Sequence, residues 1–296
     1  MKLNKMTAAM VLAGVAAAPM AQADVTLTGQ VAIGIIGSDQ DDVVDDAGVT
    51  IDEPGDFAIF GDDTIINVNA TEELSNGLTA YGNYRTDLGL VGDAATGDNI
   101  HVGIRGDFGD VRIGEVPDAT GFGQVAGDVG GAQISSDIDG EDFGISYTGS
   151  FSGATIGVNW SPAGSSDRIA AGIKYSIAGF GVGAGWGDDD ELGTLYSLGA
   201  TYDIAGASVG VAYKDFDNER ETFSATAAYG WNDISLGVTL ETEVGDVNED
   251  DVSVRFDAGY NLGASTNIST RVNIFTDDSD DDGDFIDYRL LLQKTF

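Results

Sequence analysis

The sequence predicts an all-β fold: a closed transmembrane barrel of sixteen antiparallel strands, with short turns at one rim and long loops at the other. Three observations predict it. Apolar and polar residues alternate with a period of two from end to end, and no segment has a helical period. Short turns also alternate with longer polar segments. Seven turns and eight long segments fit sixteen antiparallel strands whose two chain ends lie on the short-turn side.

Each expected strand has a set of apolar residues at alternate positions, as Val25, Leu27, Val31 and Ile33 have in the first. With their flanks, these segments approach the roughly 9–11 residues that a tilted strand needs to cross a bilayer. In chain order the apolar sets span 25–35, 66–70, 78–84, 100–104, 111–113, 143–147, 156–160, 169–175, 180–186, 196–202, 207–213, 223–229, 234–240, 252–260, 268–274 and 286–292.

The connections between these segments are rich in Gly, Asn and Asp, the residues that favour turns. The short turns are expected around 75–77, 109–110, 152–153, 178–179, 205–206, 232–233 and 262–263. The longer polar segments are expected near 37–62, 88–98, 117–140, 161–167, 187–192, 214–219, 242–250 and 276–284. A transmembrane barrel shows this asymmetry, whereas a soluble sandwich has no reason to sort its loops by length.

The basic residues test these strand faces, because a Lys or Arg that faces lipid at mid-bilayer costs about 2–4 kcal/mol. Ten of them fall on the non-apolar face: Arg85, Arg105, Arg112, Arg168, Lys174, Lys214, Arg220, Arg255, Arg271 and Arg289. Lys294 alone falls on the apolar face, close to the last residue. Aromatic residues at many strand ends suit the two interfaces of a membrane.

The N-terminus predicts export. Lys2 and Lys5 precede an apolar run that is shorter than the about 20 residues of a transmembrane helix. Residues 21–23 (Ala-Gln-Ala) have the small-x-small form of a signal-peptide cleavage site. We therefore expect a signal peptide at 1–23 and a single barrel domain at 24–296.

The composition excludes several classes of protein. The chain has 50 acidic and 13 basic residues, a net charge of −37, and the loss of Lys2 and Lys5 would make it −39. Nucleic acids and anionic membrane surfaces bind clustered positive charge, so neither is an expected partner. The chain has no Cys, so disulfides and thiolate chemistry are absent.

Two local patterns resemble the Gram-negative general diffusion porins, a family of trimeric sixteen-stranded barrels of the outer membrane. The final strand, Tyr288-Arg-Leu-Leu-Leu-Gln-Lys-Thr-Phe296, is similar to the family's barrel-assembly signal, with Lys294 as a mild departure. The segment Gly106–Gly114 resembles the turn and strand that lead into the porin constriction loop, although Glu115 stands where an Arg is usual. The resemblance implies short periplasmic turns, long outer loops, a homotrimer and contact with outer-membrane lipids or lipopolysaccharide.

By this resemblance, the segment from 117 to about 140 is the third loop, folded into the lumen to narrow the channel. The resemblance implies that acids on this loop face arginines on the opposite wall. The candidate acids are Asp118, Asp128, Asp137 and Asp139. The candidate arginines are Arg85, Arg105 and Arg289, together with Arg255 and Arg271. As an equal alternative, the arginines pair with strand carboxylates such as Asp87, Asp257 and Asp287.

The acidic run 278–284 is a weak candidate for a metal site. The spacing of its acidic residues matches the first half of an EF-hand loop, at Asp278, Asp280, Asp282 and Asp284. Arg289, however, occupies the position where an EF-hand loop has its bidentate Glu. We expect no cofactor, with loosely bound Ca²⁺ or Mg²⁺ on the acidic outer loops as an alternative.

The chain is not expected to be an enzyme. His101 is its only histidine, and no Ser-centred motif accompanies it. The glycines of segment 179–185 superficially resemble a nucleotide-binding loop. They occur at every second position, so they line one face of a strand instead.

These observations predict a water-filled channel through which small hydrophilic solutes and ions diffuse passively. More than half of the 50 carboxylates lie in five outer segments, which predicts a weak preference for cations. A solute-specific channel, for example for sugars, is the nearest alternative. A secreted Ca²⁺-binding or structural β-protein is the alternative from a different class.

Overall fold

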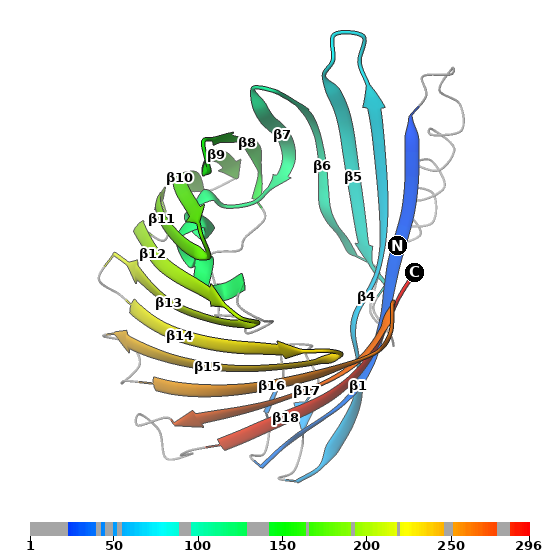
Figure 1. Cartoon of the computed structure of the whole chain (residues 1–296), viewed down its shortest axis with the longest axis vertical. Coiled ribbons are helices and arrows are strands. Elements are labelled where there is room, and N and C mark those ends of the chain that lie inside the picture. Colours follow the sequence, from blue (N-terminus) through cyan, green and yellow to red (C-terminus); the bar gives the residue numbers. More distant parts are fainter. Residues whose placement is uncertain are drawn as a thin grey trace.

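Sixteen strands of the computed structural model close into one antiparallel barrel, which confirms the predicted fold (Figure 1). The structure describes residues 23–39, 43–44, 50–51, 55–88, 96–128, 142–163, 166–190, 193–217, 220–245, 251–276 and 285–296. Each barrel strand pairs with its neighbours in sequence, and β1 closes the barrel by pairing with β18 and with β4.

The strand bounds follow the predicted segments closely. The barrel strands are β1 (Asp24–Ser38), β4 (Phe57–Glu73), β5 (Thr79–Asp87), β6 (Thr96–Gly106), β7 (Gly109–Val116), β8 (Asp142–Phe151), β9 (Ala154–Ala163), β10 (Ser166–Ile177), β11 (Phe180–Asp189), β12 (Gly193–Ile204), β13 (Ala207–Phe216), β14 (Arg220–Trp231), β15 (Ile234–Gly245), β16 (Asp251–Gly263), β17 (Thr266–Thr276) and β18 (Phe285–Thr295). A separate pair, β2 (Val43–Val44) and β3 (Thr50–Ile51), lies between β1 and β4, and a 3₁₀ helix, η1 (Ala119–Asp128), follows β7.

The barrel is apolar outside and polar inside. Adjacent residues of β12 show this: Leu198 points outward and is 54% exposed, whereas Ser197 points inward and is 0% exposed. Lys214 is likewise 3% exposed on the inner side. No helix among the described residues is long and apolar enough to span a membrane. A secreted Ca²⁺-binding β-protein would hide its apolar stripes inside, so the apolar exterior argues against that alternative.

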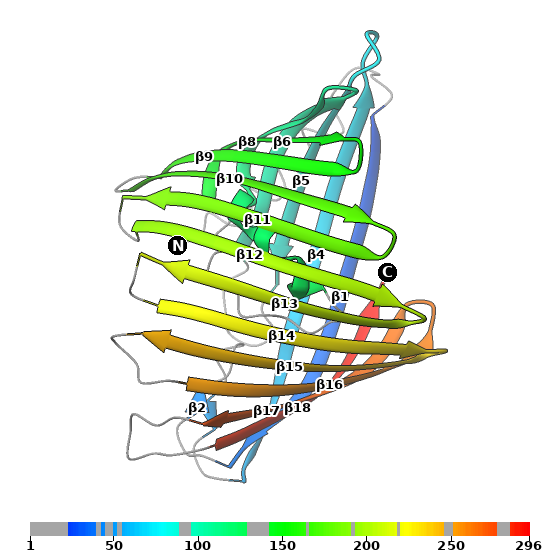
Figure 2. The ribbon, with the colours of Figure 1, turned by 60° about the vertical axis from the view of Figure 1, so that its left-hand side comes forward.

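Aromatic side chains form two outward-facing rows on the strands shown side by side in Figure 2. The row nearer the long-loop rim contains Trp160, Trp186, Tyr196, Tyr213 and Phe223. The row nearer the short-turn rim contains Tyr175, Phe180, Tyr202 and Tyr229. Rings of neighbouring strands contact each other, with 4.6 Å between the centroids of Phe180 and Tyr202. Such rows mark the two interfaces of a membrane-spanning band.

The short-turn rim carries both ends of the barrel and the turns 74–78, 107–108, 152–153, 178–179, 205–206, 232–233 and 264–265. Three of these are two-residue turns in which both residues have positive φ, for example +50° at Ser152 and +87° at Gly153. This conformation matches the right-handed twist of the flanking strands and favours Gly at the second position.

Several predicted connections differ from the structure. The expected turns at 109–110 and 262–263 are shifted by two residues, to 107–108 and 264–265. Three segments predicted as long loops are short, because the strands stay paired up to the rim and leave only 164–165, 190–192 and 217–219 between them. Acidic residues predicted to lie in loops, such as Asp188 and Asp189, belong to strand ends instead.

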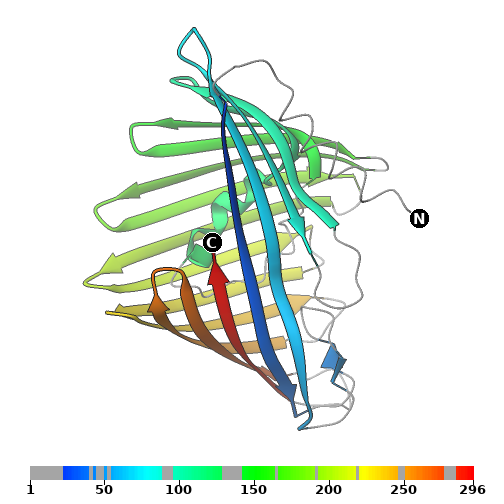
Figure 3. The same ribbon diagram turned by 90° about the vertical axis from the view of Figure 1, so that its right-hand side faces the viewer.

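The seam between the first and last strands closes at Phe296, which lies beside β1 (Figure 3). The amide N of Gly29 donates to the carbonyl O of Phe296 at 3.0 Å, and the amide N of Phe296 donates back to the carbonyl O of Gly29 at 3.0 Å. The Phe296 ring covers Gly29, where a Cβ would lie 2.8 Å from its Cε2. Glycine at this position therefore leaves room for the ring.

Substituting two neighbouring residues of β14 tests the assigned faces. Arginine at Ala227 would enter the outer apolar band, whereas arginine at Ala228 would face the inside. We expect Ala227→Arg to lower the free energy of unfolding by about 2 kcal/mol and Ala228→Arg to change it little. Urea-induced unfolding in lipid vesicles measures both values. Equal losses would contradict the assignment.

Candidate functional site

The third connection, between β7 and β8, begins on the inner side of the barrel wall. Its described part, η1, lies on the inner side of the wall and contacts β10, β11, β12 and β13 (Figure 1). The chain turns inward after Val116, which is 1% exposed. A segment in this position reduces the cross-section of the barrel.

Glycines form the floor on which η1 rests. Gly157, Gly172 and Gly185 are consecutive partners across β9, β10 and β11, and Ser197 continues this row on β12. A second pair, Gly183 and Gly199, lies beside it. A Cβ at Gly172, Gly183, Gly185 or Gly199 would collide with a backbone carbonyl oxygen of η1. The wall therefore lacks side chains where the backbone of η1 needs the space.

Polar contacts hold the first turn of η1 to this wall. Asp118 forms an ion pair with Arg168 of β10, and their side chains are 2% and 10% exposed. The same carboxylate accepts hydrogen bonds from the Thr120 amide at 2.7 Å and from the Thr120 hydroxyl at 2.6 Å. The Ala119 amide donates to Asn159 Oδ1 at 2.7 Å. These contacts fix where the loop begins.

Further along η1, two contacts continue the attachment. The Ser197 hydroxyl donates to the carbonyl oxygen of Thr120, at the end of the glycine row. The Lys174 ammonium group lies 5.2 Å from the centroid of the Phe122 ring, within the range of a cation–π interaction. Both wall residues come from strands that carry the glycine floor, so one patch of wall holds the segment.

The predicted acidic residues have different positions. Asp118 pairs with Arg168 on the wall that carries η1, not with arginines across the lumen, because the chain enters the barrel directly beside β10. Asp128 is the last residue of η1. Asp137 and Asp139 lie outside the described residues.

The proposed metal ligands Asp278, Asp280, Asp282 and Asp284 also lie outside the part of the chain that the structure describes. Within the described ranges, no group of three or more His, Cys, Asp and Glu residues could hold a metal ion.

The five predicted arginines lie on the arc of wall opposite η1. They come from β5, β6, β16, β17 and β18, which flank β1 and β4 on the side of the barrel away from β10–β13. By the alternation of their strands all five face inward: Arg85, Arg105, Arg255, Arg271 and Arg289. The strand faces predicted from the sequence thus place these five arginines across the lumen from η1.

Neighbouring polar groups engage the arginines of β16 and β17. Arg271 Nε donates to Asp257 Oδ1 at 2.9 Å, which is the strand-carboxylate pairing considered as the alternative. Arg255 Nε donates to Asn273 Oδ1 at 3.0 Å. Arg271 and Arg289 are cross-strand partners that line a hollow of about 170 Å³ in the inner wall.

Arg105 lies elsewhere, near the short-turn end of β6. Its guanidinium carbon is 5.3 Å from the centroid of the Tyr81 ring, and the Tyr81 hydroxyl donates to Asp110 Oδ1 at 2.5 Å. The buried His101 packs edge-on against the same ring, with 5.9 Å between centroids. This cluster is a packed part of the inner wall, with His101 inside it.

The sequence interpretation missed two parts of the inner wall. One is the anchor of η1, although the alternate glycines of segment 179–185 were a usable signal for a close backbone approach. The other is a buried apolar patch on β1, β4 and β18, formed by Ala32, Ile36, Phe60 and Leu291. A strict apolar-out pattern does not predict it.

Two solved structures share this barrel fold. OmpT of Vibrio cholerae, an outer-membrane protein in its trimer form, matches with a TM-score of 0.70 over 93% of this chain and 99% of that chain, at 14% identity. A mutant of the Rh. blastica porin matches with a TM-score of 0.72 over 92% of this chain and 100% of that chain, at 15% identity. At these identities the likeness concerns the fold alone.

Sequence comparison assigns the family. No curated protein matches the sequence. The family model described as Gram-negative porin matches residues 7–281, which is most of the chain. The chain therefore belongs to the Gram-negative porin family, whose members are outer-membrane channels and not enzymes.

Proposed function

We propose that the protein is a water-filled channel through which small hydrophilic solutes and ions diffuse passively across the outer membrane. The observation that carries this proposal is the closed barrel whose inner face is largely polar and on whose inner wall η1 rests. Hydroxyl and charged groups line the open part of the inner side, including Ser235, Ser269 and Arg289. Such a lining suits solutes that exchange hydrogen bonds with water, and it gives apolar solutes no continuous path.

The narrowest part of the channel is proposed to lie between η1 and the opposite arginines. Arg85, Arg255, Arg271 and Arg289 supply positive charge on that wall, with Arg105 nearer the short-turn rim. Asp128, Asp137 and Asp139 are the proposed loop acids, while Asp118 has the role of an anchor. Opposite charges across a narrow passage create a transverse field that orients dipolar solutes.

A weak preference for cations is part of the proposal. The net charge of −37 is the main support, since much of it lies in the segments of the long-loop rim. Acidic strand ends such as Asp188, Asp189 and Asp215 belong to the same rim. A negative mouth concentrates cations and repels anions at low salt. It does not determine the charge balance of the constriction itself.

The assembly and processing of the chain complete the proposal. We expect residues 1–23 to be removed during export and the barrel to form a homotrimer in contact with outer-membrane lipids and lipopolysaccharide. The structurally similar OmpT of Vibrio cholerae is described in a trimer form, which supports this assembly by analogy. Bound Ca²⁺ or Mg²⁺ on the acidic outer loops is not needed for transport.

Planar-bilayer recording tests the channel. Purified protein should give stepwise conductance, with the steps in groups of three if it is a trimer. In a salt gradient, the sign of the reversal potential should show that cations pass more easily than anions. The cation preference should fall between 0.1 M and 1 M salt, because the Debye length shortens from about 10 Å to about 3 Å. The absence of steps from folded protein would refute the channel. Block by one sugar would favour a solute-specific channel.

A valine in the glycine floor tests whether η1 narrows the channel. The added side chain of Gly183→Val would collide with the Phe122 carbonyl and displace η1 from the wall. We expect a change in single-channel conductance, with a rise if the displaced segment leaves the lumen. Gly230→Val is the matched control, because a Cβ there has no atom within 4 Å. The same conductance in both variants would show that η1 does not limit the current.

Asp118→Ala tests the anchor of η1. Removing the carboxylate leaves the Arg168 guanidinium buried without its ion-pair partner, which we expect to lower the free energy of unfolding by about 3 kcal/mol. Adding Arg168→Met should restore part of this loss, since no buried charge is then left. Chemical unfolding of the two variants and the wild type measures the difference. A double variant less stable than Asp118→Ala would contradict the pairing.

A further inference from the structure

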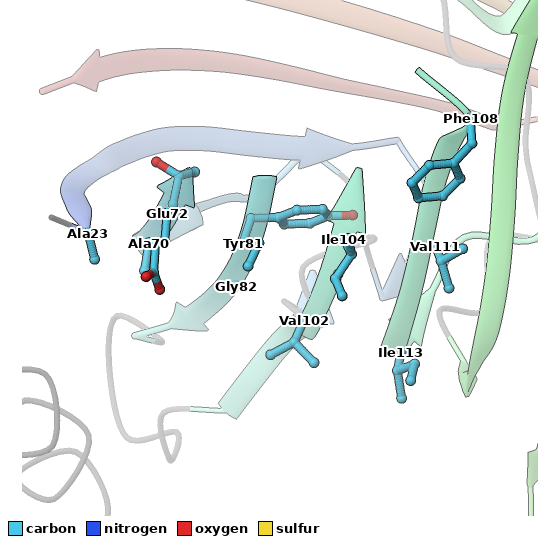
Figure 4. A pocket seen from close by; sticks show the side chains of 13 residues that line it. Ala23, Ala70, Glu72, Tyr81, Gly82, Val102, Ile104, Phe108, Val111 and Ile113 are labelled. Atoms are coloured by element: carbon cyan, nitrogen blue, oxygen red, sulfur yellow. The ribbon is translucent and has the colours of Figure 1, made fainter. Parts of the chain in front are cut away.

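Two hollows in the described part of the barrel wall differ in what they can hold. One, of about 680 Å³, lies on the outer face of β4–β7 and is lined chiefly by apolar groups such as Val102, Ile113 and Phe108 (Figure 4). The other, of about 170 Å³, lies in the inner wall at β15–β18, where solutes in transit meet it. We call this second hollow the wall recess. The side chains and glycine that define it are Ser235, Asp257, Gly259, Ser269, Arg271 and Arg289.

Small residues on three neighbouring strands create the wall recess. Gly259 of β16 is the cross-strand partner of both Ser235 of β15 and Ser269 of β17, so little or no side chain fills this level of the wall. Asp257 and Arg271, two residues further toward the long-loop rim, border it on that side. The recess has the volume of about six waters at roughly 30 Å³ each, so it suits a solute of about three or four carbons.

The charges around the wall recess do not balance. Arg271 and Arg289 are direct cross-strand partners, a position in which like charges repel. One carboxylate, that of Asp257, accepts a hydrogen bond from Arg271 Nε at 2.9 Å. At the next level toward the long-loop rim, Arg255 and Asp287 add one charge of each sign. The group therefore keeps a surplus of one positive charge, which favours a solute with a single negative charge.

The polar groups of the wall recess suit a carboxylate with a hydroxyl beside it. A guanidinium group has five N–H donors and can bind both oxygens of one carboxylate, and Arg271 uses its Nε for Asp257. Asp257 Oδ2 is buried and accepts no hydrogen bond within the described residues, which is costly for an acceptor. The hydroxyl groups of Ser235 and Ser269 can each donate or accept. A solute hydroxyl therefore finds partners next to the arginines.

The wall recess lies far from the acidic mouth. Ser235 is the second residue of β15, next to the short-turn rim. On β17, Ser269 is separated from Thr276 at the long-loop end by roughly 23 Å at the rise of a β-strand. This distance is more than twice the Debye length of about 8 Å at physiological ionic strength. The negative charge of the mouth therefore does not cancel the positive surplus of the recess.

We propose that the wall recess is a binding subsite for small hydroxylated carboxylates. The two arginines hold the carboxylate of the solute, and the two serines and Asp257 receive its hydroxyl. A neutral sugar has hydroxyl groups but no charge to match the surplus, and chloride has the charge but no hydroxyl. This inference rests on the proposed channel and names a class of solute that lingers in it.

Matched small molecules test the chemistry. Saturation-transfer NMR on the folded protein in mild detergent measures binding, with lactate as the probe. We expect lactate to bind saturably. Propionate lacks the hydroxyl and glycerol lacks the carboxylate, so each should bind severalfold more weakly. Absence of lactate binding to folded protein overturns the proposal, and so does equal binding of either analogue.

A matched pair of arginine variants tests the place. Arg289→Met removes a charge of the recess and should weaken lactate binding by at least about tenfold. Arg85→Met removes the same charge from another part of the lumen and should leave lactate binding unchanged. Cross-strand pairing leads from Arg289 to Ile36 and from Arg85, through Asn67, to Thr28, and these two residues are roughly 27 Å apart along β1. Equal losses would indicate general attraction by the lumen and overturn the subsite.

Filling the recess gives a test that keeps every charge. Ser269→Leu places a larger apolar side chain in it and should abolish lactate binding, while heat-modifiable migration in gels shows that the barrel is folded. Lactate binding that is unchanged in folded Ser269→Leu overturns the proposal. The binding measurement needs no ion flow, so conductance steps without lactate binding refute the subsite alone. Lactate binding that responds as expected in a protein without conductance supports the subsite and refutes the channel.

Discussion

The closed backbone ladder is the constraint on which the rest of the structure depends. The interior of a bilayer offers no hydrogen-bond partner, so every strand must be paired on both sides. The two bonds between Gly29 and Phe296 complete the ladder at the seam. Once the barrel is closed, each residue faces either lipid or lumen, and the alternation of Leu198 with Ser197 recurs around the barrel, apart from the inner apolar patch of β1, β4 and β18. The inner surface is then available for polar groups without cost to the outer one.

Much of this architecture could be predicted from the sequence because the cost of a misplaced residue is large. A cation that faces lipid is expensive, so the arginines report strand faces, and turns such as Ser152-Gly153 report the connections. Loop lengths were less predictable. Acidic residues such as Asp188 are tolerated at a strand end beyond the membrane as well as in a loop, so their presence does not end a strand.

The site was predictable only in part, because its contacts join distant segments. The inward faces of Arg271 and Arg289 follow from alternation, but the partner of Asp118 depends on where the loop enters the barrel. Alternation cannot specify that position. The glycine floor is the one local signal of it, since a row of missing side chains on neighbouring strands has little purpose unless another backbone lies there.

That floor has a consequence for how such a protein can change. The backbone of η1 rests on glycines of the inner face, and the lipid-facing residues of the same strands alternate with them. Changes to the loop or its seat therefore leave the membrane surface untouched, and changes outside leave the seat intact. The channel lining can therefore diverge in sequence separately from the lipid-facing surface. Relatives with similar outer surfaces can then differ widely in the solutes that pass through them.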